Sequence, residues 1–391
     1  MKAALRWYLP LVIVAATLNL RPALLTLGLV LPAVQHSLAL SPFGAGALTA
    51  LPIFALGAAS ALAVPLGRRL GWSGALVFAL ALIGAGTLLR SAGSEVALYG
   101  GALILGIGIG LGNVYVPTLV KARLAARIGV AMGVYTMMLT IGALIAILLT
   151  PLFVARFADW RPTLAVWGLP ALGAALLALP LLADNLRPGE RTAGTGLWRN
   201  PLAWAVACYM GLQSAMFYSI GLWLGVLIAA RGVSLHDVAA DFSVFYFTQF
   251  ILALGMPILL TKARRQEIIA VASAALVGAI VVAILYAPVS AIFAFCGLLG
   301  LASGALFGVA LTFQVLRART HDSAARLASM AQCVGYLIAS VGPLVLGLVN
   351  RGNDARLASA IWLATMAVAT MIAGAVAGQP RFVDAPSSGD P

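Results

Sequence analysis

One apolar run decides the fold class of this chain: residues 7–34, which read WYLPLVIVAATLNLRPALLTLGLVLPAV. A single charged residue, Arg21, interrupts it. The run exceeds the roughly 20 apolar residues that an α-helix needs to cross a bilayer. It is too long for the apolar region of a secretion signal, which spans about 7–15 residues, and no cleavage site of small residues follows it. We therefore predict a retained first transmembrane helix.

The composition of the whole chain is that of a polytopic membrane protein. Of the 391 residues, 62% are hydrophobic and 9% are charged, whereas soluble domains contain about 25% charged residues. Twelve spans of about 21 residues would take up roughly 250 positions, which leaves no room for a large soluble domain. The net charge of +13 is assigned to loops beside the membrane and not to a nucleic-acid surface, because Lys and Arg concentrate in cytoplasmic loops.

Twelve apolar segments follow one another along the chain, each long enough to span a bilayer. They are predicted to begin near Arg6, Gly44, Ser73, Val96, Ile128, Thr163, Pro201, Asp241, Ile268, Ser290, Leu327 and Leu357. Seventeen of the 24 Lys and Arg residues fall at the N-terminus, in even-numbered loops or in the tail; six fall in odd-numbered loops. The positive-inside rule then predicts cytoplasmic termini in a bacterial inner membrane.

The sequence also repeats itself over half its length. A shift of 193 positions places Gly28 on Gly221, and by the fifth and eleventh spans a shift of 201 places Tyr135 on Tyr336. Two parallel six-helix halves are the layout of major facilitator transporters. We predict an all-α membrane protein with twelve transmembrane helices in two pseudo-symmetric six-helix bundles. The bundles are expected at residues 1–183 and 201–378, with a cytoplasmic linker at 184–200 and a cytoplasmic tail at 379–391.

Polar side chains are distributed unevenly among the spans. Asn, Gln, Arg and Tyr occur in spans 1, 4, 7 and 10 and in spans 5, 8 and 11, but hardly at all in spans 3, 6, 9 and 12. A polar group facing lipid goes unsatisfied, so every third helix is predicted to be peripheral and the others to surround a wet interior. The candidate substrate-binding residues on those spans are Asn19, Arg21, Asn113, Tyr135, Gln213, Tyr218, Tyr246, Gln249, Gln332 and Tyr336.

Arg21 is the most distinctive of these candidates, because it is a charged residue within an apolar span. It lies fifteen residues after Arg6, or roughly 22 Å along a helix, and an arginine at the bilayer centre costs about 2.5–3.5 kcal/mol. All eleven acidic residues fall in loops, in the tail or in the first residues of a span, so none is predicted to pair with Arg21. Its planar guanidinium suits small oxyanions, carboxylates and pseudohalides. The alternative is that Arg21 caps the carbonyl of Leu18, whose helical donor Pro22 removes.

Most of the remaining candidates lie in pairs on one helix face. Each has two possible roles, which are ligand binding and the bridging of helices. Gln213 and Tyr218 lie on one face of span 7, Tyr246 and Gln249 on one face of span 8, and Gln332 and Tyr336 on one face of span 11. Such groups can bind a small ligand or only bridge helices, which contributes about 1 kcal/mol in model systems. Asn19 is about 200° round an ideal helix from Arg21, so both line one site only if Pro22 bends the span.

The glycines of span 4 are interpreted as packing residues. Gly106, Gly108, Gly110 and Gly112 resemble a dinucleotide-binding loop, but no strand precedes them and the final glycine is missing. Close approach of helices is the expected role. Asn113 lies on the same helix face as Gly106 and Gly110. Its side chain is therefore expected either to pack between helices or to contact the substrate.

The sequence predicts neither an enzyme nor a cofactor. The three histidines lie at span ends, no cluster has metal-ligand spacing, and no set of acid, base and nucleophile is present inside the membrane. A membrane-embedded enzyme or a sensor is therefore disfavoured. The three cysteines all lie in apolar stretches, so no disulfide is expected.

Five stretches resemble the cyanate permease and nitroimidazole transporter family of the major facilitator superfamily. They are Leu18-Asn19-Leu20-Arg21-Pro22-Ala23, Gly110-Leu111-Gly112-Asn113-Val114, Gly211-Leu212-Gln213-Ser214 with Phe217-Tyr218 and Trp223, Arg317-Ala318-Arg319-Thr320, and Met330-Ala331-Gln332-Cys333-Val334-Gly335-Tyr336. One departure is the run Gly67-Arg68-Arg69-Leu70-Gly71, which lacks the aspartate usual in the superfamily between spans 2 and 3.

The resemblance implies a secondary carrier that works by alternating access around a site between its halves. Cyanate or a similarly small anion is the implied substrate, bound by Arg21. The alternative is export of nitroimidazole-like or other amphipathic compounds, which would depend on Trp223, Tyr218 and Tyr336 and tolerate the loss of Arg21. The expected partners are this small molecule and the lipid bilayer, with no nucleic acid, and the protein is expected to be a monomer.

Overall fold

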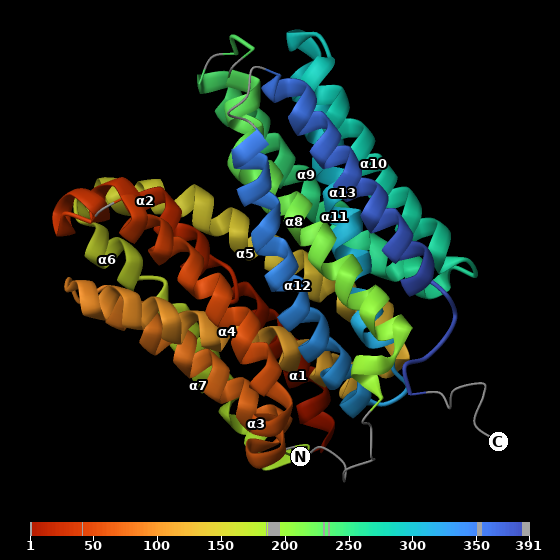
Figure 1. Ribbon diagram of the computed structural model, residues 1–391. Helices are drawn as coiled ribbons and strands as arrows, with labels where there is room; N and C mark the ends of the chain where they lie inside the picture. Colours follow the sequence, from red (N-terminus) through yellow and green to blue (C-terminus); the bar gives the residue numbers. More distant parts are fainter. Residues whose placement is uncertain are drawn as a thin grey trace. The chain divides into compact units, whose positions relative to one another are not determined.

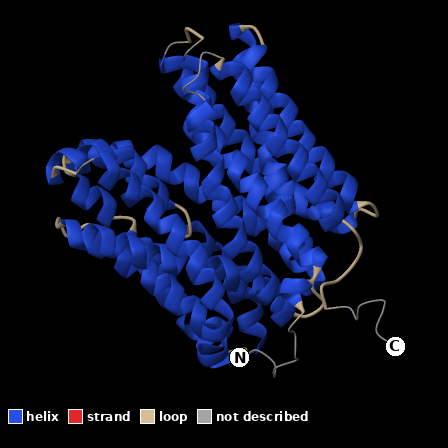
Figure 2. Cartoon of the chain, in the orientation of Figure 1, coloured by secondary structure: helices blue, strands red, loops and turns tan. Residues whose placement is uncertain are grey.

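The computed structural model describes residues 2–40, 42–184, 186, 196–229, 231–233, 235–349 and 354–384. Within these ranges the chain is helical and contains no strand (Figure 2). It forms two compact units. Unit 1 comprises Met1–Arg123 and Met138–Thr192, and unit 2 comprises Leu124–Met137 and Ala193–Pro391. The first residues of the helix that follows Arg127 thus belong to unit 2 and the rest of that helix to unit 1.

The helices of the first half are labelled in Figure 1. They are α1 (Lys2–Leu18), α2 (Pro22–Leu38), α3 (Pro42–Arg90), α4 (Glu95–Arg123), α5 (Ile128–Phe157), α6 (Trp160–Ala165) and α7 (Gly168–Ala178). The second half contains α8 (Pro201–Ala229), α9 (Leu235–Lys262), α10 (Gln266–Tyr286), α11 (Ile292–Leu316), α12 (His321–Val349) and α13 (Ala355–Ala377).

These helices provide twelve membrane crossings. Ten stretches of the described residues are long and apolar enough to span a bilayer. One of them, within α3, is 41 residues long and holds two spans joined at Gly71, while α8 adds a further 29-residue apolar helix. The pairs α1 and α2, and α6 and α7, each make one crossing between them.

Gly71 allows α3 to turn between its two spans. Its φ of 74° and ψ of 162° are accessible to glycine and strained for any other residue. The next residue, Trp72, is fully buried, and its indole lies against the backbone of Gly67, where a Cβ would be 2.7 Å from Cε3 of the ring and closer still to Cζ3. Both glycines of the Gly-Arg-Arg-Leu-Gly run are therefore required by the turn itself.

The same glycine packing recurs in the two units. In unit 1, a Cβ on Gly106 of α4 would lie 2.5 Å from the Pro52 carbonyl oxygen of α3, and Gly110 contacts the next turn of α3 in the same way. In unit 2, Gly304 of α11 lies against the backbone of Gln249 on α9. The packing interpretation of the span 4 glycines is confirmed, and the half-chain repeat extends to this contact.

Two helices begin before the membrane spans that the sequence predicted, although the apolar stretch of α9 itself begins at Ala240, beside the predicted Asp241. α9 begins at Leu235 and α12 at His321, each six residues before the predicted starts at Asp241 and Leu327. Each carries an acidic residue in its first turn, where the helix dipole favours negative charge, and hydrophobic windows do not detect such polar turns. Asp241 consequently lies almost two turns inside α9 and is only 4% exposed.

Residues 379–384, here called the C-terminal strap, are bound to unit 2. The Val383 amide donates to the Arg317 carbonyl oxygen at 2.9 Å, and the Val383 carbonyl accepts from Nδ2 of Asn200 at 3.0 Å. The Arg319 guanidinium lies over the Phe382 ring at 5.1 Å. The strap thus joins the start of α8 to the turn between α11 and α12.

Candidate functional site

The first span is broken at Pro22, which meets the condition for Asn19 and Arg21 to face one site. α1 ends at Leu18 and α2 begins at Pro22, and the amides of Asn19 and Leu20 close the end of α1 with 3.1 Å bonds to carbonyls three residues back. Arg21 occupies the N-cap position of α2, with φ −120° and ψ −36°, and Pro22 is the first helical residue. Proline is favoured there because it lacks the amide hydrogen that this position leaves unbonded.

Two close contacts hold this break in unit 1. Leu20 is 1% exposed and packs on Gly112 of α4, where a Cβ would lie 2.5 Å from the leucine Cδ2. Gly142 of α5 lies against the Leu18 carbonyl, with a Cβ 2.6 Å from its oxygen. The backbone at Arg21 is therefore flanked by packing on both sides, and glycine is needed at position 142, where the contact is with backbone.

The unit 1 candidates gather around this break. Arg21 is half-buried at the N-terminus of α2, where the helix dipole adds partial positive charge to that of the guanidinium. Asn113 is 6% exposed and directly follows Gly112, which holds Leu20. Asn19 donates its Nδ2 to the Ala15 carbonyl at 2.8 Å, so its amide nitrogen is used within its own helix.

The amide candidates of unit 2 bond within the bundle. α8 and α12 cross at Gly211 and Gly335, close to both amides. Gln332 donates its Nε2 to Oε1 of Gln314 on α11 at 3.2 Å, and Gln213 donates its Nε2 to Oγ of Ser214 at 2.6 Å. Both glutamines are at most 3% exposed. The bond of Gln332 joins α12 to α11, whereas the bond of Gln213 stays within α8.

Gln213 also lines a small cavity inside unit 2. Residues of α8, α10 and α11 form its wall, including Phe217, Val277 and Ser303. The cavity has about 10 Å³ of room, which is the space of one water molecule. A hydrogen-bonded water, and not a substrate, fits there.

Two predicted tyrosines belong to one aromatic cluster between α8 and α9. The Phe217 ring lies 5.6 Å from Tyr218 and 6.5 Å from Tyr246, and Tyr246 lies 5.0 Å from Phe245. Phe242 completes the cluster. The phenylalanines of α9 were missed by the sequence analysis, although their spacing of three and four residues places them on the face of Tyr246.

The other candidates of unit 2 lie outside the aromatic cluster and outside the glutamine contacts. Tyr135 is fully buried on the first turns of α5, which pack on α9 through Gly133. Gln249 is 5% and Tyr336 is 7% exposed, and Trp223 is half-buried on α8. Substrate contact for these residues stays a prediction.

Arg317 has a structural role that the sequence did not reveal. Its position after the tenth predicted span is that of a loop cation, but it is 4% exposed. It donates to the carbonyls of Ala377 and Gly378 at 2.7 and 3.1 Å, and also to Oε1 of Gln266. Burial lowers the pKa of Arg317 to about 10, with nearby Glu267 acting in the opposite direction. The guanidinium caps the end of α13, where unpaired carbonyls favour a cation.

Comparison with known proteins identifies the family. The sequence matches the profile of the Major Facilitator Superfamily over residues 13–343. It is 32% identical over 360 residues to the 2-nitroimidazole transporter of Escherichia coli (strain K12), covering 90% of this chain and 91% of that protein. It is 27% identical over 344 residues to the cyanate transport protein CynX of the same bacterium, covering 87% and 89%.

The fold has relatives of known structure. The proton:xylose symporter XylE bound to 6-bromo-6-deoxy-D-glucose matches with a TM-score of 0.76 over 95% of both chains, at 15% identity. The predicted fold class, twelve transmembrane helices in two six-helix bundles, is thereby confirmed. The chain is a multi-pass membrane transporter that belongs to the major facilitator superfamily, in the group of the 2-nitroimidazole and cyanate transporters.

Proposed function

We propose that this protein is a secondary transporter that moves a small anion, cyanate-like or a small organic anion, across a bacterial inner membrane by alternating access. Its termini are placed in the cytoplasm, in keeping with the charge asymmetry of the loops. The proposed transporter acts as a monomer. Arg21 is the residue that binds the anion.

The break of the first span carries this proposal. A discontinuous membrane helix presents the positive end of its second half to an anionic substrate in other transporters. Here α2 begins at the break with Arg21 at its N-cap, so the fixed charge of the guanidinium and the partial charge of the helix end coincide. The relative named as a cyanate transport protein is in keeping with a small anion.

The aromatic cluster of unit 2 favours a second candidate function. Phe217, Tyr218 and Tyr246 offer ring faces and edges that suit a flat, neutral aromatic compound. The relative named as a 2-nitroimidazole transporter is in keeping with such a substrate. In that case the protein exports an amphipathic compound and does not require the charge of Arg21.

Thermal unfolding of the purified protein with each compound tests the two functions. A ligand that binds only the folded state raises the unfolding temperature. We expect sodium cyanate or a small carboxylate to stabilise the wild type and to lose this effect in Arg21→Gln. Tyr246→Leu is the corresponding variant for the second function, because it removes one ring of the aromatic cluster. If 2-nitroimidazole alone stabilises the protein, and Tyr246→Leu but not Arg21→Gln removes the effect, the anion function is wrong and the export function replaces it.

A further inference from the structure

Two tryptophans at the start of α8 are exposed and yet held in place. Trp198 is 56% and Trp204 is 40% exposed. Their rings meet edge to face with centroids 5.9 Å apart, and the Trp204 indole Nε1 donates to the Trp198 carbonyl at 2.7 Å. Tryptophan has a large apolar surface to bury. The pair therefore presents a preformed apolar surface, which an apolar partner outside the protein would cover.

Arginines lie on the three segments that meet at Val383 of the C-terminal strap. They are Arg199 just before α8, Arg319 in the turn between α11 and α12, and Arg381 in the strap. The two hydrogen bonds of Val383, one with Asn200 and one with the turn, hold these segments side by side. All three arginines are exposed, and none of their guanidiniums has an ion pair among the described residues.

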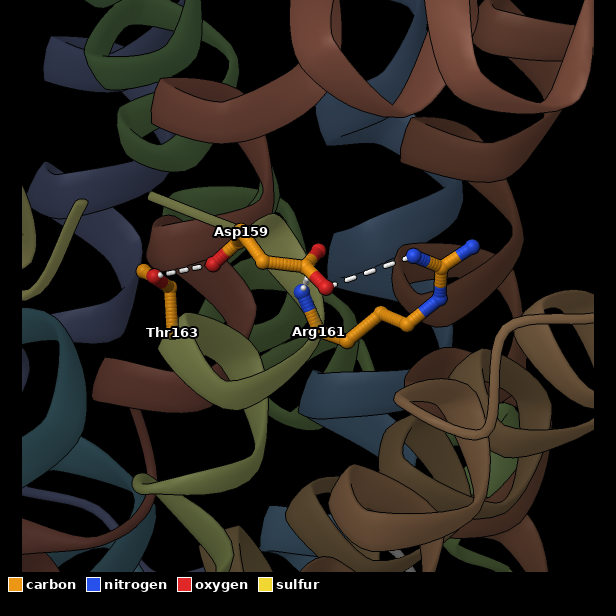
Figure 3. A network of polar contacts seen from close by, with 3 residues as sticks. All are labelled: Asp159, Arg161 and Thr163. Atoms are coloured by element: carbon orange, nitrogen blue, oxygen red, sulfur yellow. Dashed lines mark hydrogen bonds and ion pairs between the residues drawn. The ribbon is translucent and has the colours of Figure 1, made fainter. Parts of the chain in front are cut away.

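Other surface arginines are neutralised where they lie. In unit 1, Asp159 accepts from Nη1 of Arg161 at 3.3 Å and from the Arg161 amide at 3.0 Å, and its own carbonyl accepts from Thr163 (Figure 3). In unit 2, Arg265 forms an ion pair with Glu267 at 3.0 Å. Arg161 and Arg265 thus bring no net charge to their surroundings, and they are internal controls for the arginines at the strap.

Positive charge predominates at the strap. The Asp384 carboxylate accepts from the Arg319 backbone amide at 3.1 Å, while the Arg319 guanidinium lies over the Phe382 ring at 5.1 Å. One carboxylate therefore accompanies three arginines. A guanidinium presents a planar fork of donors that matches the oxygens of a phosphate group. The strap arginines consequently suit a partner that carries a phosphate.

This end of unit 2 is also where membrane helices stop. α8 begins at Pro201, α11 ends at Leu316 and α13 ends at Ala377. The end of an apolar span marks the border of the hydrocarbon layer, where tryptophan concentrates and the lipid headgroups lie. These segments are predicted to face the cytoplasm, and on that side the membrane surface is negatively charged. The expected neighbour of the tryptophans and arginines is therefore an anionic lipid.

We propose that Trp198, Trp204, Arg199, Arg319 and Arg381, here called the strap patch, bind one anionic phospholipid. The arginines hold its phosphodiester, and its glycerol and upper acyl chains cover the tryptophan rings. Free phosphate would satisfy the arginines but leave the rings exposed, so the lipid is the better occupant. A lipid bound here links the strap to the start of α8 and stabilises unit 2. The patch belongs to unit 2, whereas Arg21 belongs to unit 1, and the lipid is not the cargo.

Thermal unfolding with defined lipids tests this site. The purified full chain, in a detergent with an uncharged headgroup, is heated with phosphatidylglycerol or with phosphatidylcholine of the same acyl chains. We expect phosphatidylglycerol to raise the unfolding temperature in a saturable manner, by about 4 °C at a hundredfold excess over its apparent Kd, and phosphatidylcholine to leave it nearly unchanged. Equal effects of the two lipids would overturn the proposal, as would an effect of inorganic phosphate as large as that of phosphatidylglycerol.

Variants locate the effect. Each arginine near an anionic surface contributes about fivefold to affinity, so Arg199→Gln combined with Arg381→Gln should weaken phosphatidylglycerol binding about 25-fold. Both side chains are exposed, so this double variant should unfold like the wild type when no lipid is added. Trp198→Leu should weaken binding and keep the preference for the anionic lipid.

A matched double variant is the control. Arg161→Gln combined with Arg265→Gln removes the same number of arginines, both of which already have carboxylate partners, and should keep the full response to phosphatidylglycerol. A response that survives unchanged without Arg199 and Arg381, or that disappears without Arg161 and Arg265, would contradict the assignment.

Discussion

Gln332 of α12 and Gln314 of α11 are joined by a 3.2 Å hydrogen bond between two buried side-chain amides. Removal of one partner leaves the other amide buried and unpaired, which costs about 1–3 kcal/mol, whereas replacement of both is nearly neutral. We expect Gln332→Leu and Gln314→Leu each to lower the unfolding temperature and the double variant to recover most of the loss. Transport by the double variant then separates the two roles, because a substrate contact of Gln332 would remain lost after stability is restored.

Arg21 is expected to act through its charge and its planar shape together. Arg21→Lys keeps the charge and loses the fork of donors, so it should weaken binding of the transported anion, and Arg21→Gln should remove it. Loss of a charged contact in a desolvated site costs about 2–5 kcal/mol, or at least roughly 30-fold in affinity. Equilibrium binding to purified protein measures both variants. Affinity within a few fold of the wild type in Arg21→Gln would argue against the anion site.

Two glycines of α4 provide a matched pair for the packing between α3 and α4. Gly110 lies directly against the Leu56 backbone, whereas a Cβ on Gly100 would meet nothing within 4 Å. Gly110→Ala should therefore destabilise the protein by about 1–3 kcal/mol. Gly100→Ala should be neutral, or stabilising by up to about 1 kcal/mol, because alanine favours the helix. Thermal unfolding of the two variants, side by side, measures the difference.

The C-terminal strap should contribute to the stability of unit 2. Deletion of residues 379–391 removes the hydrogen bonds of Val383 and the stacking of Phe382 on Arg319, which are worth about 1 kcal/mol each. Deletion of residues 385–391 alone leaves these contacts intact and serves as the control. We expect a lower unfolding temperature for the longer deletion only. Equal unfolding of both truncated proteins would show that the strap does not stabilise the unit.

The topology can be checked with single cysteines in a cysteine-free background. The positions predicted to face the cytoplasm are Arg68, Lys121, Arg191, Lys262 and Arg319, the last of which replaces Arg317 because Arg317 is buried. These cysteines should resist an impermeant thiol reagent in intact cells, while cysteines at Arg156 and Arg351 should react. Labelling of two or more of the first group would reverse the assignment.

The sequence predicted the fold well because apolar length and periodicity follow directly from the bilayer. The break at Pro22 and the packing role of the span 4 glycines were also predictable, since both follow from local backbone chemistry. Polar first turns of helices lie outside the predicted spans, as at Leu235 of α9, although its apolar stretch begins at Ala240. There the dipole of the helix end stabilises residues that hydropathy excludes.

Burial of individual cations could not be predicted from the sequence. Arg90 and Arg317 both stand next to apolar spans and resemble ordinary loop residues, yet both are enclosed. Their burial depends on which helices meet around them: α4 through Gly101 for Arg90, and the end of α13 for Arg317. These contacts join residues far apart in the chain, and a single sequence contains no direct signal for them. A glycine opposite the arginine is the only local hint, and it becomes visible once the helix pairing is known.

The broken first span also affects how the protein is made. α1 and α2 have 17 residues each, and the break between them, which carries the charged side chain of Arg21, enters the membrane when the first span is inserted. The residue that shelters it, Gly112, is synthesised 92 positions after Leu20. Until α4 arrives, lipid surrounds polar groups that it cannot satisfy. The nascent chain therefore needs the insertion machinery, or a water-filled path, to accommodate this break until three further spans have been made.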